Sequence, residues 1–511
     1  MKSAQRLLEY AHTRGVRACF ANPGTSEMHL VAALDAVPGI RPILALFEGV
    51  ATGAADGFGR MAQLPALTLL HLGPGLGNGF ANLHNAHRAR TPIVSLVGEH
   101  ATYHLANDPP LASDIAAVAG PVSKWMRTVN RPEDLVVAGA DAIDAACALG
   151  PASLILPADV AWSDVEPAAP AAKPSAPPQS WSANLDKAAR SLGAGALLFL
   201  GGRYISEKAG AAALAIAEKT GCKVMVETFP ARVARGAGRA ALTKLLYLSE
   251  MAAGTLADTA TIVLAGAGAP VAFFALPGRP TILSREGAEI VPFAAPVDNL
   301  EAALVALAEA VGAKIKAAAA VERPQAPDAG DAVDPHSLAR ALAATMPENA
   351  IVSDESNTLG AFCFDLCAQA APHDWMTLTG GSIGQGLPLA TGAAVACPDR
   401  RVVALQADGS ALYTIQALWT QAREGLNVTN IILNNGAYGI LKLEMMRAGI
   451  NAQTHAASEL FDLRRPSIDF VQVASGFGVR GQRVSTQRDL VAALRRSFAE
   501  PGPSLIEVQF P

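Results

Sequence analysis

The chain has 511 residues, of which 51% are hydrophobic and 17% charged, and it contains 45 glycines and 34 prolines. This size and composition predict a globular protein of more than one domain and exclude the disordered, collagen-like and coiled-coil classes. Forty basic against 45 acidic residues give a net charge of −5, and no basic stripe follows any expected helix. Nucleic acid is therefore not an expected partner.

The N-terminal segment MKSAQRLLEYAHTRG carries charges where a signal peptide has an apolar run. Later apolar runs are interrupted by Gly or Pro well short of the ~20 residues that span a bilayer. We therefore expect a cytoplasmic protein with no membrane partner. The 6 cysteines are scattered without a CxxC pair, which favours small buried hydrophobic residues over disulfides or zinc ligands.

Short apolar runs alternate with longer amphipathic stretches along the whole chain. The runs expected to be strands are, in chain order, 18–21, 42–47, 66–72, 92–98, 196–202, 223–227, 261–267, 401–407 and 430–435. The stretches expected to be helices among them include 26–37, 49–62 and 207–221. This alternation is typical of parallel sheets covered by helices.

Two Pro- and Ala-rich stretches, 163–184 and 312–335, break the apolar periodicity and are predicted to be linkers. They divide the chain into three segments of ordinary domain size, 1–162, 185–311 and 336–511. We therefore predict an α/β fold of three doubly wound domains with mainly parallel sheets.

The most informative spacing lies in the third segment. Asp408 follows the expected strand 401–407, and Asn435 follows the next strand, 27 residues later. Because the carboxyl ends of neighbouring parallel strands meet at one edge of a sheet, the two side chains should converge there. Carboxylate and amide oxygens suit Mg²⁺, with room left for phosphate oxygens and water. Taken singly, DGS and NNG are also ordinary turn sequences.

This pair resembles the thiamine diphosphate motif, GDG followed downstream by NN, with Ala407 in place of the first glycine. Further similarities occur in the same order along the chain. A strand, Glu48 and a helix over 41–60 resemble the family's segment that ends in AADGYAR. Segment 379–388 resembles the one that grips the aminopyrimidine. Segments 22–27, 70–71 and 434–439 resemble the substrate and diphosphate loops of benzoylformate decarboxylase.

The resemblance is to the group that includes pyruvate oxidase, acetolactate synthase and benzoylformate decarboxylase. It implies that the first domain binds the pyrimidine and the third the diphosphate. Glu48 would hydrogen-bond the pyrimidine N1′, Ile383 would bend the cofactor, and the Gly381 carbonyl would accept from the 4′-amino group. Mg²⁺ would be held by Asp408, Asn435 and the carbonyl of Ala437. The other implied cofactor contacts are Asn357, Thr358, Ser382, Gly409, Ser410 and Tyr438.

The same resemblance implies three catalytic residues, Glu48, His71 and Thr25. His71 would orient the substrate carboxylate or relay a proton, although a buried histidine held by backbone is the structural alternative. The implied substrate contacts are Pro23, Gly24, Thr25, Leu111, Leu441 and Glu444. Two departures concern the substrate: segment 269–275 lacks the second histidine of the decarboxylases, and Glu444 stands where benzoylformate decarboxylase has an aromatic residue.

The implied activity is non-oxidative decarboxylation of a 2-oxo acid through an enamine, which is released as an aldehyde or ligated to a second carbonyl. An acetolactate synthase large subunit with FAD is the alternative, but the short central segment has no GxGxxG, so FAD is not expected. A serine hydrolase using Ser382, Asp408 and His455 matches GxSxG and the Ser, Asp, His order. A relative that binds the cofactor without catalysis is the remaining alternative.

Glu48 and Asp408 lie in different segments of the chain, and in the resembled family the two come from different subunits. The resemblance therefore implies a homodimer with active sites between subunits, commonly assembled into a homotetramer. The only other partner expected is the small-molecule 2-oxo acid.

Overall fold

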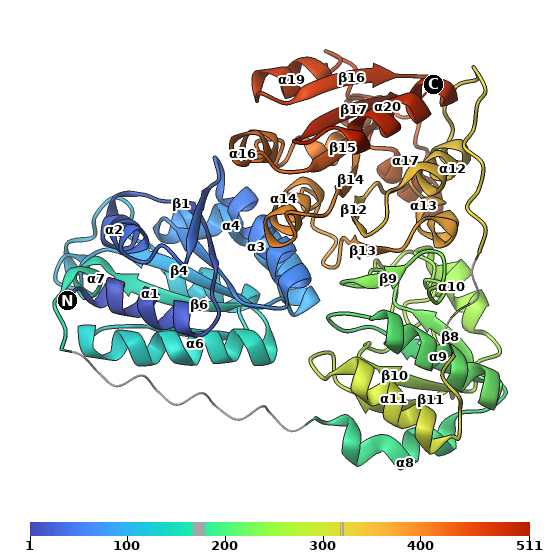
Figure 1. Cartoon of the computed structure of the whole chain (residues 1–511), viewed down its shortest axis with the longest axis horizontal. Helices are drawn as coiled ribbons and strands as arrows, with labels where there is room; N and C mark the ends of the chain where they lie inside the picture. Colours follow the sequence, from blue (N-terminus) through green and yellow to red (C-terminus); the bar gives the residue numbers. More distant parts are fainter. Residues whose placement is uncertain (167–178, 317, 319–320, 511) are drawn as a thin grey trace.

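The computed structural model describes residues 1–166, 179–316, 318 and 321–510. They form three α/β units, each built on a mainly parallel sheet with helices against its faces (Figure 1). The predicted three-part α/β architecture is confirmed. Part of each predicted linker, residues 167–178, 317 and 319–320, lies outside the described residues.

The first unit has six parallel strands in the order β2-β1-β3-β4-β6-β5. The strands are β1 (Ala18–Asn22), β2 (Arg41–Leu44), β3 (Ala66–Leu70), β4 (Ile93–Glu99), β5 (Trp125–Thr128) and β6 (Ala152–Pro157). The helices are α1 (Ser3–Thr13), α2 (Met28–Ala36), α3 (Glu48–Ala62), α4 (Leu72–Ala89), α5 (Ile115–Ala119), α6 (Leu135–Leu149) and α7 (Ala158–Trp162). Short 3₁₀ turns are η1 (Thr25–Glu27), η2 (Leu105–Asn107), η3 (Gly120–Val122) and η4 (Pro132–Asp134).

The central unit has four parallel strands in the order β11-β10-β7-β8. They are β7 (Ala196–Leu200), β8 (Lys223–Val226), β10 (Thr261–Ala265) and β11 (Glu289–Ala294), with helices α8 (Trp181–Ser191), α9 (Glu207–Thr220), α10 (Ser249–Leu256) and α11 (Leu300–Ala310). One further strand, β9 (Val233–Arg235), leaves this unit and pairs antiparallel with β13 (His373–Thr377) of the third sheet. The central and third units are thus joined by a shared sheet edge.

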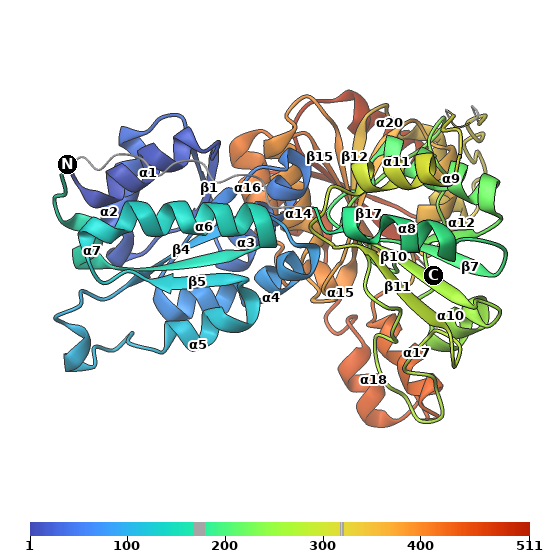
Figure 2. The ribbon, with the colours of Figure 1, turned by 90° about the horizontal axis from the view of Figure 1, so that it is seen from below.

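The third sheet runs β16-β17-β15-β14-β12-β13-β9. Its own strands are β12 (Ala350–Glu355), β13, β14 (Val402–Ala407), β15 (Val428–Asn434), β16 (Arg480–Val484) and β17 (Ser504–Gln509). The helices are α12 (Pro335–Thr345), α13 (Cys363–Leu366), α14 (Gly386–Ala396), α15 (Asp408–Ala411), α16 (Ala417–Glu424), α17 (Gly439–Arg447), α18 (His455–Phe461), α19 (Phe470–Gly476) and α20 (Gln487–Ala499), with a 3₁₀ turn η5 (Cys367–Gln369). Helices α17 and α18 project away from the sheet (Figure 2).

Helices α3 and α14 pack against each other where the first and third units meet (Figure 1). Glycine makes the approach possible, because a Cβ on Gly57 would lie 1.9 Å from the Leu389 carbonyl oxygen and one on Gly392 would lie 1.7 Å from that of Ala54. The apolar side chains of both helices belong to one continuous core. The contact brings the beginning of α3, which carries Glu48, close to the loop that precedes α14.

A buried ion pair joins all three units at the other end of α3. The Arg60 guanidinium bonds Asp56 and also donates to the carbonyl oxygens of Thr377 (2.9 Å) and Ala231 (3.2 Å). Both charged side chains are almost fully buried. Breaking such a pair by removing one partner typically costs about 3–5 kcal/mol, because the other charge stays buried.

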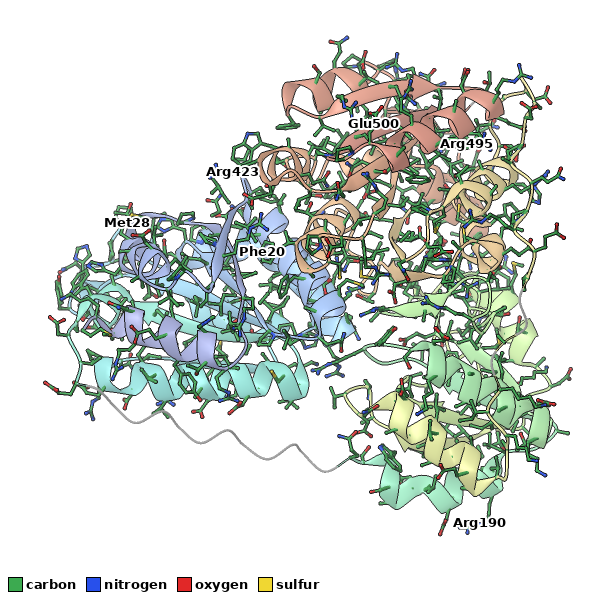
Figure 3. The ribbon with its side chains drawn as sticks, in the orientation of Figure 1. Phe20, Met28, Arg190, Arg423, Arg495 and Glu500 are labelled. Atoms are coloured by element: carbon green, nitrogen blue, oxygen red, sulfur yellow. The ribbon has the colours of Figure 1, made fainter. Side chains whose placement is uncertain are left out.

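Among the described residues no helix is both long and apolar enough to cross a bilayer. Phe20 is buried within the first unit, whereas Arg190 and Arg495 lie on the surface (Figure 3). All six cysteines are free thiols, and four of them are buried. The prediction of burial is wrong for Cys147, which is exposed, and Cys397 is only partly covered.

Candidate active site

A pocket lies at the carboxyl edge of the third sheet, where β12, β14 and β15 are neighbours. The register pairs Ala407 with Leu433, so that the residues following both strands emerge side by side. Nine of the predicted cofactor and metal contacts line the pocket: Asn357, Thr358, Ile383, Asp408, Gly409, Ser410, Asn435, Ala437 and Tyr438. Strand order and spacing therefore bring together residues from four separate stretches of the third unit.

Asp408 is the only acidic residue that lines this pocket, and it is buried. Its Oδ2 accepts from the backbone N–H groups of Asn435 (3.1 Å) and Gly436 (2.8 Å), and its Oδ1 accepts from Gly409 (2.8 Å). Burial raises the pKa of the Asp408 carboxyl, and these backbone donors oppose the rise. No ion pair compensates its charge in the described part of the chain.

The donor set around Asp408 fits Mg²⁺. Asn435 and Ala437 line the same pocket. The Asn435 amide oxygen accepts from the Ala437 N–H (3.0 Å) and the Ala437 carbonyl from the Gly439 N–H (2.9 Å), and both are hard oxygen donors of the kind this cation prefers. Within the described residues no three His, Cys, Asp or Glu side chains gather as a metal site. A cation here would therefore depend on one carboxylate, amide and carbonyl oxygens, and oxygens from its ligand.

Loop 379–386, which precedes α14, is held by polar contacts from two sides. Glu355 at the end of β12 accepts from the backbone N–H groups of Gly384 (2.7 Å) and Gly386. Asn85 on α4 donates to the Ser382 carbonyl (2.7 Å) and accepts from its N–H (3.1 Å). Burial raises the pKa of Glu355 to about 7, against the pull of the two N–H donors.

Glu48 is the first residue of α3 and is buried. Its Oε2 accepts from the Asn78 amide of α4 at 3.0 Å. The α4 backbone approaches closely, since a Cβ on Gly75 would lie 3.0 Å from the Glu48 Oε1. Asn82 donates both to the Gly49 carbonyl (2.8 Å) and, in the third unit, to the Gly384 carbonyl (3.2 Å). Glu48 itself does not line the diphosphate-side pocket.

His71 forms a pair with a residue that the sequence analysis did not single out. Its Nδ1 lies 2.8 Å from the Oε2 of Glu27, which also accepts from the Gly24 N–H at 2.9 Å. The other oxygen, Oε1, is buried and has no hydrogen-bond partner among the described residues. Burial raises the pKa of Glu27, and the contact with His71 opposes that rise. Thr25, in η1, is exposed beside this pair.

The predicted substrate contacts are only partly brought together. Pro23 and Gly24 precede η1, and a Cβ on Gly24 would lie 2.2 Å from the His71 ring. Leu111 and Leu441 are exposed in the isolated chain. Gly381 and Ser382 lie in loop 379–386 but do not line the pocket.

The serine-hydrolase arrangement does not form. In the described chain Ser382, Asp408 and His455 make no hydrogen bond to one another, and the His455 side chain is 90% exposed beside Glu459. The Asp408 oxygens are turned instead to backbone N–H groups of its own pocket.

Sequence reasoning missed four residues that position His71, Glu48 and loop 379–386: Glu27, Asn78, Asn85 and Glu355. A signal existed for Glu355, which lies three residues after the apolar run 350–352 and two residues before Asn357. The two asparagines lie in the Asn-rich stretch 78–85, whose helical spacing places them on related faces. Nothing local distinguishes Glu27, because its partner is 44 residues away.

A second cavity, of about 570 Å³, opens at the carboxyl ends of the central strands. His87, Arg88, Arg90 and Lys124 of the first unit face it, and Glu227 follows β8 on the other side. The three Arg and Lys cations form no ion pair in the described residues. Burial and the neighbouring Arg side chains lower the pKa of Lys124, and burial raises the pKa of Glu227 to about 8.

Comparison with known proteins agrees with this geometry. Residues 1–117 match the thiamine pyrophosphate enzyme N-terminal TPP binding domain, and residues 359–508 match the C-terminal TPP binding domain. A Mycobacterium tuberculosis protein provisionally named acetolactate synthase large subunit IlvX is 50% identical over 100% of this chain and 99% of its own length. Benzoylformate decarboxylase of Pseudomonas aeruginosa is 29% identical over 98% of this chain and 97% of its own.

Among solved structures, the thiamine diphosphate-dependent 4-hydroxybenzoylformate decarboxylase of Rhodococcus jostii superposes with a TM-score of 0.83 at 25% identity, covering 100% of this chain and 99% of that one. The matched N-terminal domain contains Glu48, and the matched C-terminal domain contains Asp408. The chain therefore belongs to the thiamine pyrophosphate enzyme family, in the acetolactate synthase and benzoylformate decarboxylase group.

Proposed function

We propose that the protein catalyses the thiamine diphosphate- and Mg²⁺-dependent, non-oxidative decarboxylation of a 2-oxo acid. The product leaves as an aldehyde or is ligated to a second carbonyl. The observation that carries the proposal is the buried Asp408 carboxylate, uncompensated by any cation in the described chain and surrounded by the other predicted diphosphate and metal contacts.

In this proposal the third unit anchors the cofactor. Asp408, Asn435 and the Ala437 carbonyl hold Mg²⁺, and Gly409, Ser410, Tyr438, Asn357 and Thr358 surround the diphosphate. When bound, the cofactor would supply a nucleophilic carbon that adds to the 2-oxo group and a cationic ring that takes up the electron pair left when CO₂ departs. Anchoring by metal and backbone donors needs no lysine in the pocket.

Glu48 would exchange a proton with the pyrimidine N1′ of the bound cofactor. Its position supports the role, since it is buried, heads a helix and is held by one neutral donor, Asn78. The Gly381 carbonyl would accept from the 4′-amino group, and Ile383, already part of the pocket wall, would set the cofactor's bend. Glu355 and Asn85 act as positioning residues by fixing loop 379–386.

His71 would orient the substrate carboxylate or pass a proton to the reacting carbon, with Thr25 beside it. The Glu27 contact supports this role, because a carboxylate bonded to the Nδ1 of the ring leaves Nε2 as the nitrogen that can accept or give a proton.

We also propose that the active site is completed by a second copy of the chain, in a homodimer that assembles further into a tetramer. Glu48 does not line the Asp408 pocket of its own chain, and this supports the arrangement. Mixing the inactive variants Glu48→Gln and Asp408→Ala tests it. With sites between subunits, random mixing restores about a quarter of wild-type activity, because half the dimers are mixed and one of their two sites is intact. With sites inside one chain, mixing restores nothing.

The central experiment uses the same two variants separately. Asp408→Ala should lose Mg²⁺-dependent cofactor binding, whereas Glu48→Gln should keep binding and lose most turnover. Asp399→Ala, an exposed acid of the same unit, is the matched control and should behave as wild type. Incubation with a panel of 2-oxo acids, scoring CO₂ together with aldehyde or acyloin, separates decarboxylation from carboligation. Full activity in Glu48→Gln would rule out the mechanism.

An acetolactate synthase that also binds FAD is the second candidate, and the 570 Å³ cavity is the observation that favours it. Its cationic rim suits a diphosphate, and Gly202 and Gly266 bring backbone to its edge. The visible absorption spectrum of the purified protein, taken before and after denaturation, tests for flavin. A flavin-free protein with full carboligase or decarboxylase activity excludes this candidate.

A further inference from the structure

The buried ion pair of Asp56 and Arg60 in α3 also contacts loop 379–386, and it does so near both ends of the loop. The Asp56 Oδ2 accepts from the Gln385 amide at 2.7 Å, and the Arg60 guanidinium donates to the Thr379 hydroxyl at 2.9 Å. Thr379 begins the loop, and Gln385 directly precedes the first residue of α14. The ion pair therefore holds the loop where it begins and where it enters α14.

These contacts use the whole hydrogen-bonding capacity of the Asp56 carboxylate. Its Oδ1 accepts from Arg60 (2.8 Å) and Thr91 (2.5 Å), and its Oδ2 accepts from Arg60 (2.6 Å) and Gln385. An ionised carboxylate offers about four acceptor positions, so all of them are filled. The Gln385 side chain is buried, and its Oε1 has no hydrogen-bond partner among the described residues. An unpaired buried acceptor is unfavourable, so the bond to Asp56 is what favours this amide at its position.

Helix α3 thus carries two polar groups with different positions along its length. Glu48 is its first residue, and Asp56 follows eight residues later, about 12 Å further along the helix axis. In the proposed homodimer Glu48 meets the cofactor that is anchored by the third unit of the other subunit. Asp56 instead bonds the loop of its own chain, whose Ile383 lines the Asp408 pocket of that chain. The beginning and the middle of α3 are therefore connected to different active sites.

We propose that Asp56 and Arg60 are positioning residues for loop 379–386 of their own chain, so that α3 serves two active sites of the homodimer, one through Glu48 and the other through the ion pair. The inference rests on the proposed function and deepens it. Neither Asp56 nor Arg60 lines the cofactor pocket, so both act through the loop. A loop fixed before the cofactor arrives favours binding, because apparent affinity falls with the fraction of protein in the competent conformation.

The first test measures the loop in the cofactor-free protein by amide hydrogen exchange. The backbone N–H groups of Ser382 and Gly384 are hydrogen-bonded, so their exchange reports whether the loop opens. Asp56→Asn keeps the side-chain size but turns an NH₂ group toward Gln385 or Arg60, which are themselves donors. We expect the loop amides to exchange about 10- to 100-fold faster and thiamine diphosphate to bind about 10- to 100-fold more weakly, the usual value of one hydrogen bond to a charged group.

Two further variants separate positioning of the loop from general stability. Gln385→Met leaves the ion pair intact and removes only its bond to the loop, so it should change loop exchange and cofactor affinity about 10-fold with a melting temperature near that of wild type. Asp374→Asn is the matched control, because Asp374 is a buried carboxylate held by Arg232 (2.9 Å) and Arg400 (2.6 Å) that bonds no residue of the loop in the described chain. It should lower the melting temperature and leave loop exchange and affinity unchanged. Unchanged loop exchange and affinity in Asp56→Asn and Gln385→Met, or equal changes in Asp374→Asn, overturn the proposal.

Mixing of variants tests which active site the ion pair serves. Asp56→Asn should lower turnover about a hundredfold by displacing the loop. Mixed with Glu48→Gln, it should restore about a quarter of wild-type activity, because both changes damage the same site of each mixed dimer and leave the other site intact. Mixed with Asp408→Ala, it should restore nothing, because the two changes damage different sites.

The reverse pattern would show that the ion pair acts on Glu48 and would overturn the proposal. Failure of Glu48→Gln and Asp408→Ala to complement each other would instead count against the proposed sites between subunits. It would also remove the two-site part of this proposal, whereas loop exchange in the cofactor-free protein would still decide the positioning role of Asp56.

Discussion

Replacing Gly57 with alanine should force apart the two helices that join the first and third units. The added Cβ would lie 1.9 Å from the Leu389 carbonyl oxygen and 3.0 Å from the Ala393 nitrogen, both of them backbone atoms of α14. Ordinary contact begins near 3.4 Å, so α3 and α14 must separate by about 1.5 Å (3.4 minus 1.9). No side-chain rotation can relieve this clash.

The expected cost is at the upper end of the range for overpacking a core, about 3 kcal/mol. Catalysis should suffer more than stability, because α3 begins with Glu48 and α14 directly follows loop 379–386. A displacement of about 1 Å in a catalytic constellation can cost a hundredfold in rate. We therefore expect kcat/KM to fall by about two orders of magnitude.

Gly254→Ala is the matched control. Gly254 lies in α10, is exposed and has no atom within 4 Å of an added Cβ, so alanine should stabilise its helix by about 0.5–1 kcal/mol. The assay is urea unfolding followed by circular dichroism, together with cofactor affinity and turnover of each variant. If Gly57→Ala unfolds at the same urea concentration as wild type and keeps full turnover, the close helix contact is not what positions Glu48 and loop 379–386.

Three further predictions concern Glu227, Arg60 and Gly24. Burial raises the pKa of the Glu227 carboxyl from 4.5 to about 8. Its contribution to stability is therefore full below pH 4.5 and is lost as the pH rises through about 8, at no more than about 1.4 kcal/mol per pH unit. Glu227→Gln should flatten this part of a plot of melting temperature against pH, and an unchanged plot would show that the carboxyl is not the source. Arg60→Met should cost about 3–5 kcal/mol in urea unfolding by leaving Asp56 charged and buried, and a loss below 1 kcal/mol would contradict the ion pair's role. Gly24→Ala should displace the His71 ring and lower kcat while leaving the melting temperature near that of wild type; retention of kcat would remove His71 from the mechanism.

Much of the fold was predictable from local pattern. The expected strands in the first unit, at 66–72 and 92–98, correspond to β3 and β4, and the helix expected over 49–62 is α3. These elements were predictable because their apolar runs, glycine-rich turns and spacing depend only on residues that are adjacent in the sequence. The strands that were not predicted are β5, β6, β9, β11, β12, β13, β16 and β17. Of these, β9 pairs with a sheet outside its own unit. The partner of a strand such as β9 depends on which sheet edge remains unpaired after the whole chain has packed.

The candidate site divides in the same way. The sequence by itself determined the Asp408 pocket, because two strand ends separated by one helix must meet at the same edge of a parallel sheet. Only the tertiary structure decided that Glu27 holds His71, that Asn85 holds Ser382 and that Arg447 ties α17 to α10. These contacts join residues 44 to 297 positions apart, and their energy depends on burial that no local stretch of chain can create.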